Sequence, residues 1–200
     1  MGPSPARLES VCVFCGSSDA AEPAFLADAR ALGVDLAAAK IRLVYGGGGV
    51  GLMGACARAA HEAGGEVLGI IPDFLTASER AYDLVETVVV SSMHERKARM
   101  FEAADGFAVL PGGVGTLEEV VELLSWRRLG LHAKPVVFHN PQGFWRPLFD
   151  VFQHTIDHRL TPGSFSQAWT AVERIEDVIP ALRANLPAAE SAEPAAMRVT

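Results

Sequence analysis

Short, almost continuously apolar runs alternate along the chain with longer stretches in which apolar residues recur at helical spacing. The runs that we expect to form strands cover residues 10–16, 41–45, 66–71, 86–90, 106–110, 135–139 and 168–172. The stretches with helical spacing cover residues 22–39, 52–63, 93–104, 116–129, 144–158 and 175–185. Strands that are apolar throughout and separated by helices are typical of a parallel sheet buried on both faces. The pattern therefore predicts an α/β fold, a doubly wound parallel sheet in a three-layer α/β/α arrangement.

The length of 200 residues fits one domain with a sizeable core. We expect this domain to span residues 10–186. Residues 1–9 are polar and are predicted to be a flexible N-terminus, and residues 187–200, rich in Ala, Glu and Pro, are predicted to be a disordered tail.

Composition and charge exclude several classes of protein. A formal net charge of −7 and a pI of about 5.3 argue against a nucleic-acid-binding surface, which usually needs a basic face. No apolar run approaches the roughly 20 residues needed to cross a bilayer. The polar N-terminus also lacks the apolar stretch of a signal peptide. We therefore expect a cytoplasmic protein that binds neither nucleic acid nor membrane.

The cysteines and histidines indicate neither a metal site nor a disulfide framework. Cys12 and Cys15 form a C-x-x-C pair inside a strand, where positions three apart point to opposite faces. No second pair follows that would complete a zinc site, and an odd count of 3 cysteines does not suggest disulfides. We expect buried apolar cysteines. None of the histidines has a spacing typical of metal ligands: His61, His94, His132, His139, His154 and His158.

A glycine-rich loop joins the strand at 106–110 to the helix that we expect from Thr116. Residues 111–119 read P-G-G-V-G-T-L-E-E. Side chains are nearly absent from this turn, so backbone N–H groups can approach a ligand closely. The helix start adds unpaired N–H groups and a partial positive charge, which makes a phosphate the natural ligand.

A second loop of this kind follows the strand at 41–45, where residues 46–54 read G-G-G-G-V-G-L-M-G. Two such loops predict a nucleotide or sugar-phosphate site. Residues 49–54 also fit G-x-G-x-x-G, and Asp73 stands near the expected position of a ribose-binding acid, as in dinucleotide-binding folds. The same glycines equally serve tight packing of a strand against a helix, so a nicotinamide cofactor is the weaker interpretation.

Thr116 and Glu119 permit two interpretations. In a capping box, Thr116 would be the N-cap residue and would accept a hydrogen bond from the N–H of Glu119, whose carboxylate would return to the N–H of Thr116. Alternatively, Glu119 has a chemical task, because a carboxylate beside a phosphate loop otherwise weakens anion binding. The apolar stripe of this helix is Leu117, Val120, Val121 and Leu124, which leaves Glu118, Glu119 and Glu122 outside it.

Basic side chains open the helix at 93–104. Arg96 and Lys97 lie in its first turns, where cations oppose the helix macrodipole, so a bound anion would explain them. A solvated helix face is the alternative. Lys97 could also form a Schiff base, but the glycine loops offer no partner specific for pyridoxal. Ser17 and Ser18 follow the first strand and either donate to a phosphate or purine or cap the next helix.

Together these segments closely resemble the Lonely Guy family of cytokinin riboside 5′-monophosphate phosphoribohydrolases, long mislabelled as lysine decarboxylases. The resemblance rests on residues 13–18 (V-F-C-G-S-S), 45–54, 92–97 (S-M-H-E-R-K) and 111–119, and it covers about residues 10–186. It implies a Rossmann-like sheet, a homodimer with active sites at the interface, and no organic cofactor. The implied reaction splits the N-glycosidic bond of an isopentenyl-type adenine riboside 5′-monophosphate into the free base and ribose 5-phosphate.

The resemblance also implies roles for individual residues. The family's catalytic arginine falls on Arg96 and its catalytic glutamate on Glu119, while Lys97 matches a substrate-binding position. Whether Arg96 serves the phosphate or the departing purine is left open. Residues 76–86 form a variable stretch, and this leaves the base preference open. The other predicted substrate-binding residues are Ser17, Gly47, Gly48, Met53, Glu79, Gly112, Gly113, Gly115 and Thr116.

Two other functions remain open. A general AMP nucleosidase would use the same groups, whereas a non-catalytic nucleotide or molybdenum-cofactor carrier would need only the glycine loops and a cation. Arg96 with Glu119 therefore favours the enzyme. Trp126 lies off the apolar stripe, where a monomer would expose it, so we expect a two-fold homodimer formed by the helices at 116–129 and 93–104.

Overall fold

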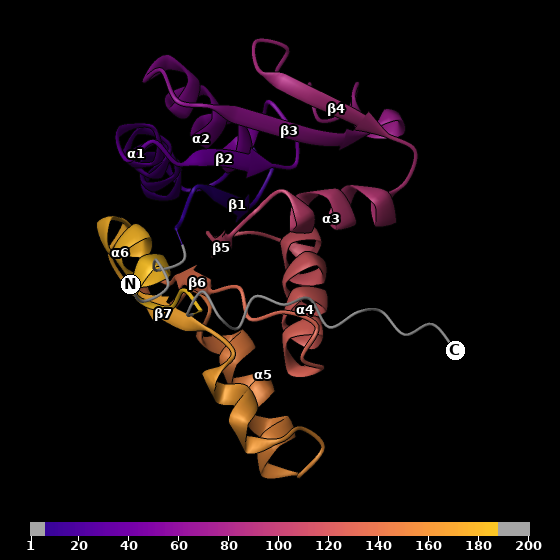
Figure 1. Ribbon diagram of the computed structural model, residues 1–200, viewed down its shortest axis with the longest axis vertical. Helices are drawn as coiled ribbons and strands as arrows, with labels where there is room; N and C mark the ends of the chain where they lie inside the picture. Colours follow the sequence, from indigo (N-terminus) through magenta and orange to yellow (C-terminus); the bar gives the residue numbers. More distant parts are fainter. Residues whose placement is uncertain (1–6, 188–200) are drawn as a thin grey trace, which may run out of the picture.

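The computed structural model describes residues 7–187 of the chain. Its centre is a seven-stranded sheet in which every strand pair is parallel (Figure 1). The strands are β1 (Ser10–Phe14), β2 (Arg42–Tyr45), β3 (Val67–Pro72), β4 (Glu86–Val90), β5 (Gly106–Val109), β6 (Val136–His139) and β7 (Thr170–Val172). Residues 1–6 of the predicted flexible N-terminus, 1–9, and residues 188–200 of the predicted disordered tail, 187–200, lie outside the described residues.

The strand order is β4-β3-β2-β1-β5-β6-β7. The chain builds the sheet outward from β1 to β4 and then returns to the other side of β1 to add β5, β6 and β7. The winding direction therefore reverses between β1 and β5. In open α/β sheets, ligands bind beyond the carboxyl ends of the strands at such a point.

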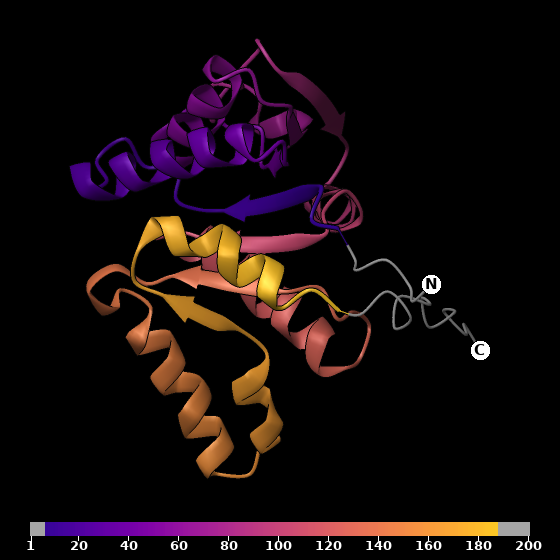
Figure 2. The same ribbon diagram turned by 60° about the vertical axis from the view of Figure 1, so that its left-hand side comes forward.

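Helices cover both faces of this sheet. The first core packs α1, α2 and α6 against one face, and the second packs α3, α4 and α5 against the other (Figures 1 and 2). Alternate residues of β1 point into the two cores, with Val11 in the first and Cys12 in the second. The predicted three-layer α/β/α fold is thus confirmed. The α-helices are α1 (Pro23–Ala38), α2 (Gly51–Glu62), α3 (Met93–Glu102), α4 (Val114–Arg128), α5 (Arg146–Asp157) and α6 (Val178–Ala184); the short 3₁₀ helices are η1 (Asp73–Leu75), η2 (Pro141–Gly143), η3 (Gly163–Gln167) and η4 (Ile175–Asp177).

The cysteines behave as apolar core residues. Cys12 and Cys15 lie in opposite cores, as the strand spacing predicts, and Cys56 is also buried and free. Within residues 7–187, no group of three or more His, Cys, Asp or Glu side chains is arranged to hold a metal ion. None of the helices in that part of the chain combines the length and the apolar character required to cross a membrane.

Backbone hydrogen bonds tie together the loops that follow β1, β2 and β5. The N–H of Gly16 donates to the carbonyl of Pro111 at 3.0 Å, and the N–H of Leu52 donates to the carbonyl of Gly16 at 3.0 Å. Gly51 has a φ of +57°, and a Cβ there would lie 2.4 Å from the carbonyl carbon of Ser17. A glycine is therefore required for α2 to approach the first loop. The fold gathers the three loops at one edge of the sheet.

Candidate active site

The N-terminus of α4 is open. The helix begins at Val114, and its N-cap residue is Gly113, whose extended backbone supplies no side-chain hydrogen bond. Within residues 7–187, the N–H groups of Val114, Gly115 and Thr116 have no hydrogen-bond partner, and the first turn holds no acidic residue. Several backbone donors and the positive end of the helix dipole therefore face the same space, as the sequence predicts for a phosphate site.

Of the two interpretations of Thr116 and Glu119, the capping box is wrong. Thr116 lies inside the first turn of α4 rather than at its N-cap. Its side chain packs over Gly112, where a Cβ would lie 2.2 Å from the Thr116 Oγ1. A side-chain N-cap of the kind considered for Thr116 occurs instead at α3, where Ser92 accepts from the N–H of Glu95 at 3.1 Å. The Glu95 carboxylate in turn accepts from the N–H of Ser91 at 3.0 Å.

The N-terminus of α2 is closed, in contrast to that of α4. The N–H of Gly51 donates to the carboxylate of Asp19 at 2.9 Å, and the N–H groups of Leu52 and Met53 donate to the carbonyl of Gly16. These donors are therefore unavailable to a phosphate. The structure contradicts the prediction of a second phosphate-binding helix start, and the alternative, tight packing of strand against helix, is the correct interpretation of these glycines.

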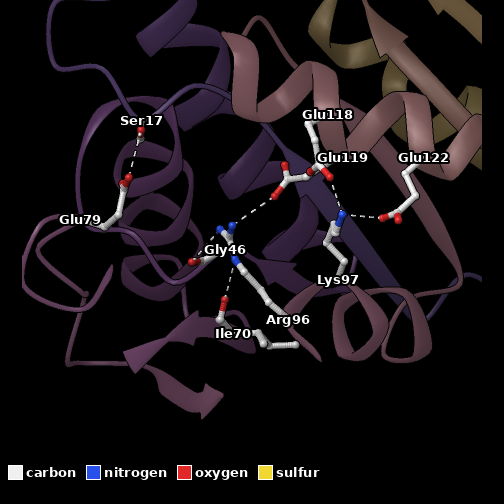
Figure 3. A network of polar contacts seen from close by, with 9 residues as sticks. All are labelled: Ser17, Gly46, Ile70, Glu79, Arg96, Lys97, Glu118, Glu119 and Glu122. Carbon is white, nitrogen blue, oxygen red and sulfur yellow. Dashed lines mark hydrogen bonds and ion pairs between the residues drawn. The ribbon is translucent and has the colours of Figure 1, made fainter. Parts of the chain in front are cut away.

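Arg96 is buried on α3, with 7% of its surface exposed, so the alternative of a solvated helix face is wrong for this residue. Its Nε donates to the carbonyl of Ile70 at 3.1 Å, and one terminal nitrogen, Nη2, donates to the carbonyl of Gly46 at 3.0 Å (Figure 3). A Cβ on Gly46 would lie 1.9 Å from that nitrogen. The first glycine of the 46–54 loop thus makes room for the guanidinium.

Glu119 faces Arg96 from α4. Its Oε1 lies 3.3 Å from the other terminal nitrogen of Arg96, and both side chains are more than nine-tenths buried (Figure 3). Glu119 therefore lies on the buried face of α4, together with Val120 and Leu123, and not outside the core stripe as predicted. Val121, which we assigned to that stripe, is 45% exposed.

The burial of Glu119 changes its acidity. Burial raises the pKa of Glu119 to about 7, against the lowering effect of the Arg96 charge; Glu118 raises it further and Lys97 lowers it. A carboxyl group with a pKa near neutral pH can both hold and release a proton under physiological conditions. Such a group beside an open helix start is a strong candidate for acid–base chemistry.

Glu79 lies across the site from Glu119, in the segment between β3 and β4. The hydroxyl of Ser17 donates to its Oε1 at 3.5 Å, and its Oε2 is buried without a hydrogen-bond partner in the described chain (Figure 3). Backbone bonds fold this segment onto the second glycine loop: the N–H of Gly49 donates to the carbonyl of Glu79, and the N–H of Tyr82 to that of Gly47. A Cβ on Gly48 would lie 3.1 Å from Glu79 Oε2.

The predicted site residues thus fall into two groups around the carboxyl ends of β1, β2 and β5. One group, on α3 and the start of α4, consists of Arg96, Lys97, Gly112, Gly113, Gly115, Thr116 and Glu119. The other, from the first two loops and the segment before β4, consists of Ser17, Gly47, Gly48, Met53 and Glu79. Two further features were not predicted from the sequence: the Asp19 carboxylate at the start of α2 and the contacts of Lys97 with Glu118 and Glu122.

The parallel sheet, the open start of α4 and the buried Glu119 together define the class of protein. It is a Rossmann-like protein with features of a nucleotide site, in which a carboxyl group with a pKa of about 7 can exchange a proton. Comparison with known proteins assigns its family. Residues 53–182 match the family model described as "Possible lysine decarboxylase". The chain is 43% identical over 182 residues to a probable cytokinin riboside 5′-monophosphate phosphoribohydrolase of Oryza sativa subsp. japonica, covering 87% of this chain and 80% of the relative. The chain therefore belongs to the family of cytokinin riboside 5′-monophosphate phosphoribohydrolases, the Lonely Guy family.

A further relative agrees with this assignment, and solved structures share the fold. A cytokinin riboside 5′-monophosphate phosphoribohydrolase of Rhodococcoides fascians is 44% identical over 178 residues, with 88% of this chain and 89% of the relative covered. Among solved structures, a molybdenum cofactor binding protein from Rippkaea orientalis has a TM-score of 0.69 at 25% identity, covering 89% of this chain and 97% of its own. The molybdenum cofactor carrier protein of Chlamydomonas reinhardtii, at 23% identity and a TM-score of 0.68 over 90% of this chain and 99% of its own, shares the fold.

The acidity of Glu119 can be measured directly. We expect its carboxyl group to titrate near pH 7 in the ligand-free protein, because burial is the largest influence on its pKa. Replacing the Arg96 charge by Arg96→Gln should raise the Glu119 pKa further. Carboxyl-¹³C NMR on glutamate-labelled protein would measure both values, with the Glu119 resonance assigned by its loss in Glu119→Gln. A wild-type pKa near the ordinary value of 4.5 would contradict this picture of the site.

Proposed function

We propose that this protein hydrolyses the N-glycosidic bond of a cytokinin riboside 5′-monophosphate and releases the free base and ribose 5-phosphate. Relatives that carry the name of this activity are 40–44% identical to the chain over most of its length. The observation that carries the proposal is the buried Arg96–Glu119 pair beside the open start of α4. Together they supply a phosphate anchor and a carboxyl group able to act on the attached sugar.

The unpaired N–H groups of α4 anchor the 5′-phosphate. Val114, Gly115 and Thr116 offer three backbone donors at the positive end of the helix dipole. Glu119 follows Thr116 by one helical turn on the same buried face, so the ribose of a nucleotide anchored there extends toward its carboxyl group. The glycosidic bond then lies between Glu119 on α4 and Glu79 on the opposite side of the site.

Glu119 assists the departure of the base. Breaking an N-glycosidic bond develops positive charge on the sugar, as in the oxocarbenium-like transition states of glycoside hydrolysis. An ionised carboxylate stabilises that charge and can accept the proton of the attacking water, and this proton is then available to neutralise the departing base. Arg96 holds the Glu119 carboxylate in place at 3.3 Å while its own remaining contacts go to backbone carbonyls. We therefore infer that Arg96 positions the Glu119 carboxylate beside the reacting sugar and does not bind the phosphate.

The family description as a possible lysine decarboxylase does not fit the chemistry of this site. A lysine that forms a Schiff base needs a lowered pKa so that its amine is neutral. Burial alone would lower the pKa of Lys97, but hydrogen bonds and charges from Glu118 and Glu122 raise it. Lys97 is thus a cation held by two carboxylates, and hydrolysis of a nucleotide suits the site better.

The two rival functions differ from the proposal at identifiable places. A molybdenum-cofactor carrier has the same fold, but a carrier needs no buried carboxyl group with a pKa near neutral. A general AMP nucleosidase would use the same anchor and the same pair and would differ only at the base. The segment that holds Glu79 against Ser17 and Gly48 borders the base side and is where this preference is set.

A two-fold homodimer through α4 completes the proposal. The outer face of α4 carries apolar side chains in the open, with Val114 82% and Leu129 59% exposed. A shallow groove, called here the α4 groove, runs along this face. It is lined by Val114, Leu117, Glu118, Val121, Glu122, Ser125, Trp126 and Leu129. Trp126 is half-buried and packs edge-on against Phe101, with ring centroids 5.3 Å apart, so it is less exposed than predicted. An exposed apolar face of this kind favours a second copy as its cover.

We also propose a cytoplasmic location. Three buried cysteines, Cys12, Cys15 and Cys56, are free, as is usual for proteins of reducing compartments.

Base release is the direct test of the activity. We expect isopentenyladenosine 5′-monophosphate to be cleaved, and the corresponding riboside to react with a kcat/KM at least about 100-fold lower, because charge-assisted contacts to phosphate are worth about 1.5–3 kcal/mol each. Chromatographic measurement of free base from both compounds and from AMP decides the substrate class. Equal kcat/KM for nucleotide and riboside would show that the start of α4 does not anchor the phosphate.

Two matched substitutions at Val114 test whether the N–H groups of α4 anchor the phosphate. Proline is tolerated at the first position of a helix, so Val114→Pro should remove one N–H donor without breaking α4. Val114→Ala removes the same exposed side chain and keeps the donor. Only the proline variant should lose discrimination between nucleotide and riboside.

A charged substitution in the α4 groove tests whether two chains assemble through it. Val121→Glu places a carboxylate on the lining of the groove and should reduce the mass in light scattering from twice the 21.2 kDa chain mass to a single chain. Leu160→Glu, at a residue that is 81% exposed and outside the groove, is the control and should leave the mass unchanged. A wild-type protein that is fully active as a single chain would rule out a functional dimer.

A further inference from the structure

Lys97 follows Arg96 directly on α3, but its partners are different. Its side chain is 13% exposed, and its Nζ lies 2.5 Å from Glu118 Oε1 and 2.8 Å from Glu122 Oε2 (Figure 3). The two glutamates are four residues apart and therefore present neighbouring carboxylates on one side of α4. They hold the ammonium between them, and their hydrogen bonds outweigh the effect of burial and raise the Lys97 pKa.

The charges of this cluster do not favour an anion. With all three groups ionised, Lys97, Glu118 and Glu122 carry one net negative charge. Glu118 is only two residues beyond Thr116, within about one helical turn of the open N–H groups of α4, and Glu122 follows one turn farther along the helix. A phosphate bound there meets a neutralised lysine instead of a free cation, and the Coulomb attraction that a free lysine would add is lost.

We propose that Glu122, acting with Glu118, is a positioning residue that retains Lys97 and thereby limits the affinity of the site for phosphate. This inference rests on the proposed function, in which substrate and product carry the same phosphate. A free lysine at this place would strengthen the hold on both equally, which lowers KM without speeding the chemical step. It would also slow the release of ribose 5-phosphate. The retained lysine keeps the anchor strong enough for binding and weak enough for turnover.

The test is Glu122→Gln, which keeps the size of the side chain and removes its charge. We expect inorganic phosphate and ribose 5-phosphate to bind about three- to tenfold more tightly to the variant in calorimetric titrations. The KM for the nucleotide should fall by a similar factor, while kcat changes less. The gain in affinity should shrink as the salt concentration rises, because it is electrostatic. A purely structural role of Glu122 would produce none of these changes.

Two further variants show whether the gain passes through Lys97. Glu86→Gln removes the same charge from an exposed ion pair with Arg42 at the other end of the sheet, and should leave phosphate affinity unchanged. Adding Lys97→Met to Glu122→Gln should abolish the gain, because no lysine remains to be released. Light scattering on each variant checks that its oligomeric state is the same as that of the wild type.

The outcomes separate this inference from the proposed function. Unchanged or weaker phosphate binding by a folded Glu122→Gln protein would overturn the inference, and so would an equal gain in Glu86→Gln or a gain that persists without Lys97. A wild-type protein that releases no base from the nucleotide would instead refute the proposed function. An active wild type with an unaltered Glu122→Gln variant would refute the inference alone.

Discussion

The buried ion pair of Arg96 and Glu119 is the interaction on which the rest of the site depends. Removing two charges from water costs several kcal/mol for each ion, and mutual attraction offsets this only when the other polar atoms are also satisfied. Here the guanidinium donates to the carbonyls of Ile70 and Gly46, so its cost is largely offset. The carboxylate has fewer partners, and burial therefore raises the Glu119 pKa to about 7. The unequal support of the two ions leaves the carboxyl group reactive.

The two glycine-rich loops show how similar sequences acquire different tasks. Both follow a strand and open a helix, but the start of α2 is closed by Asp19 and by the carbonyl of Gly16. The start of α4 has no such partners within residues 7–187. A helix start is an anion site only when the surrounding chain leaves its donors unpaired. One loop consequently shapes the site and makes room for Arg96, and the other keeps its donors free for the proposed phosphate.

The sequence predicted the fold well because apolar runs and helical spacing report directly on burial. It predicted the order of elements and the edge at which the loops gather, which follow from parallel strands. It placed Glu119 outside the core, because the periodicity of apolar residues counts every charged residue as solvent-facing. The spacing of Thr116, Glu119 and Leu123 was compatible with one buried face, but only the position of Arg96 on a distant helix makes burial of that carboxylate possible. The roles of Asp19 and Glu122 likewise depend on contacts between distant segments, which local patterns do not encode.

The most direct test of this account is the single-turnover rate of base release from isopentenyladenosine 5′-monophosphate by the wild type and by Glu119→Gln. The substitution keeps the shape of the side chain and removes its ability to become a carboxylate. We predict a rate at least about 100-fold lower, the usual scale of a lost acid–base group, with binding of ribose 5-phosphate retained. A Glu119→Gln protein that releases base at close to the wild-type rate would contradict the central claim that this buried carboxyl group performs the chemistry.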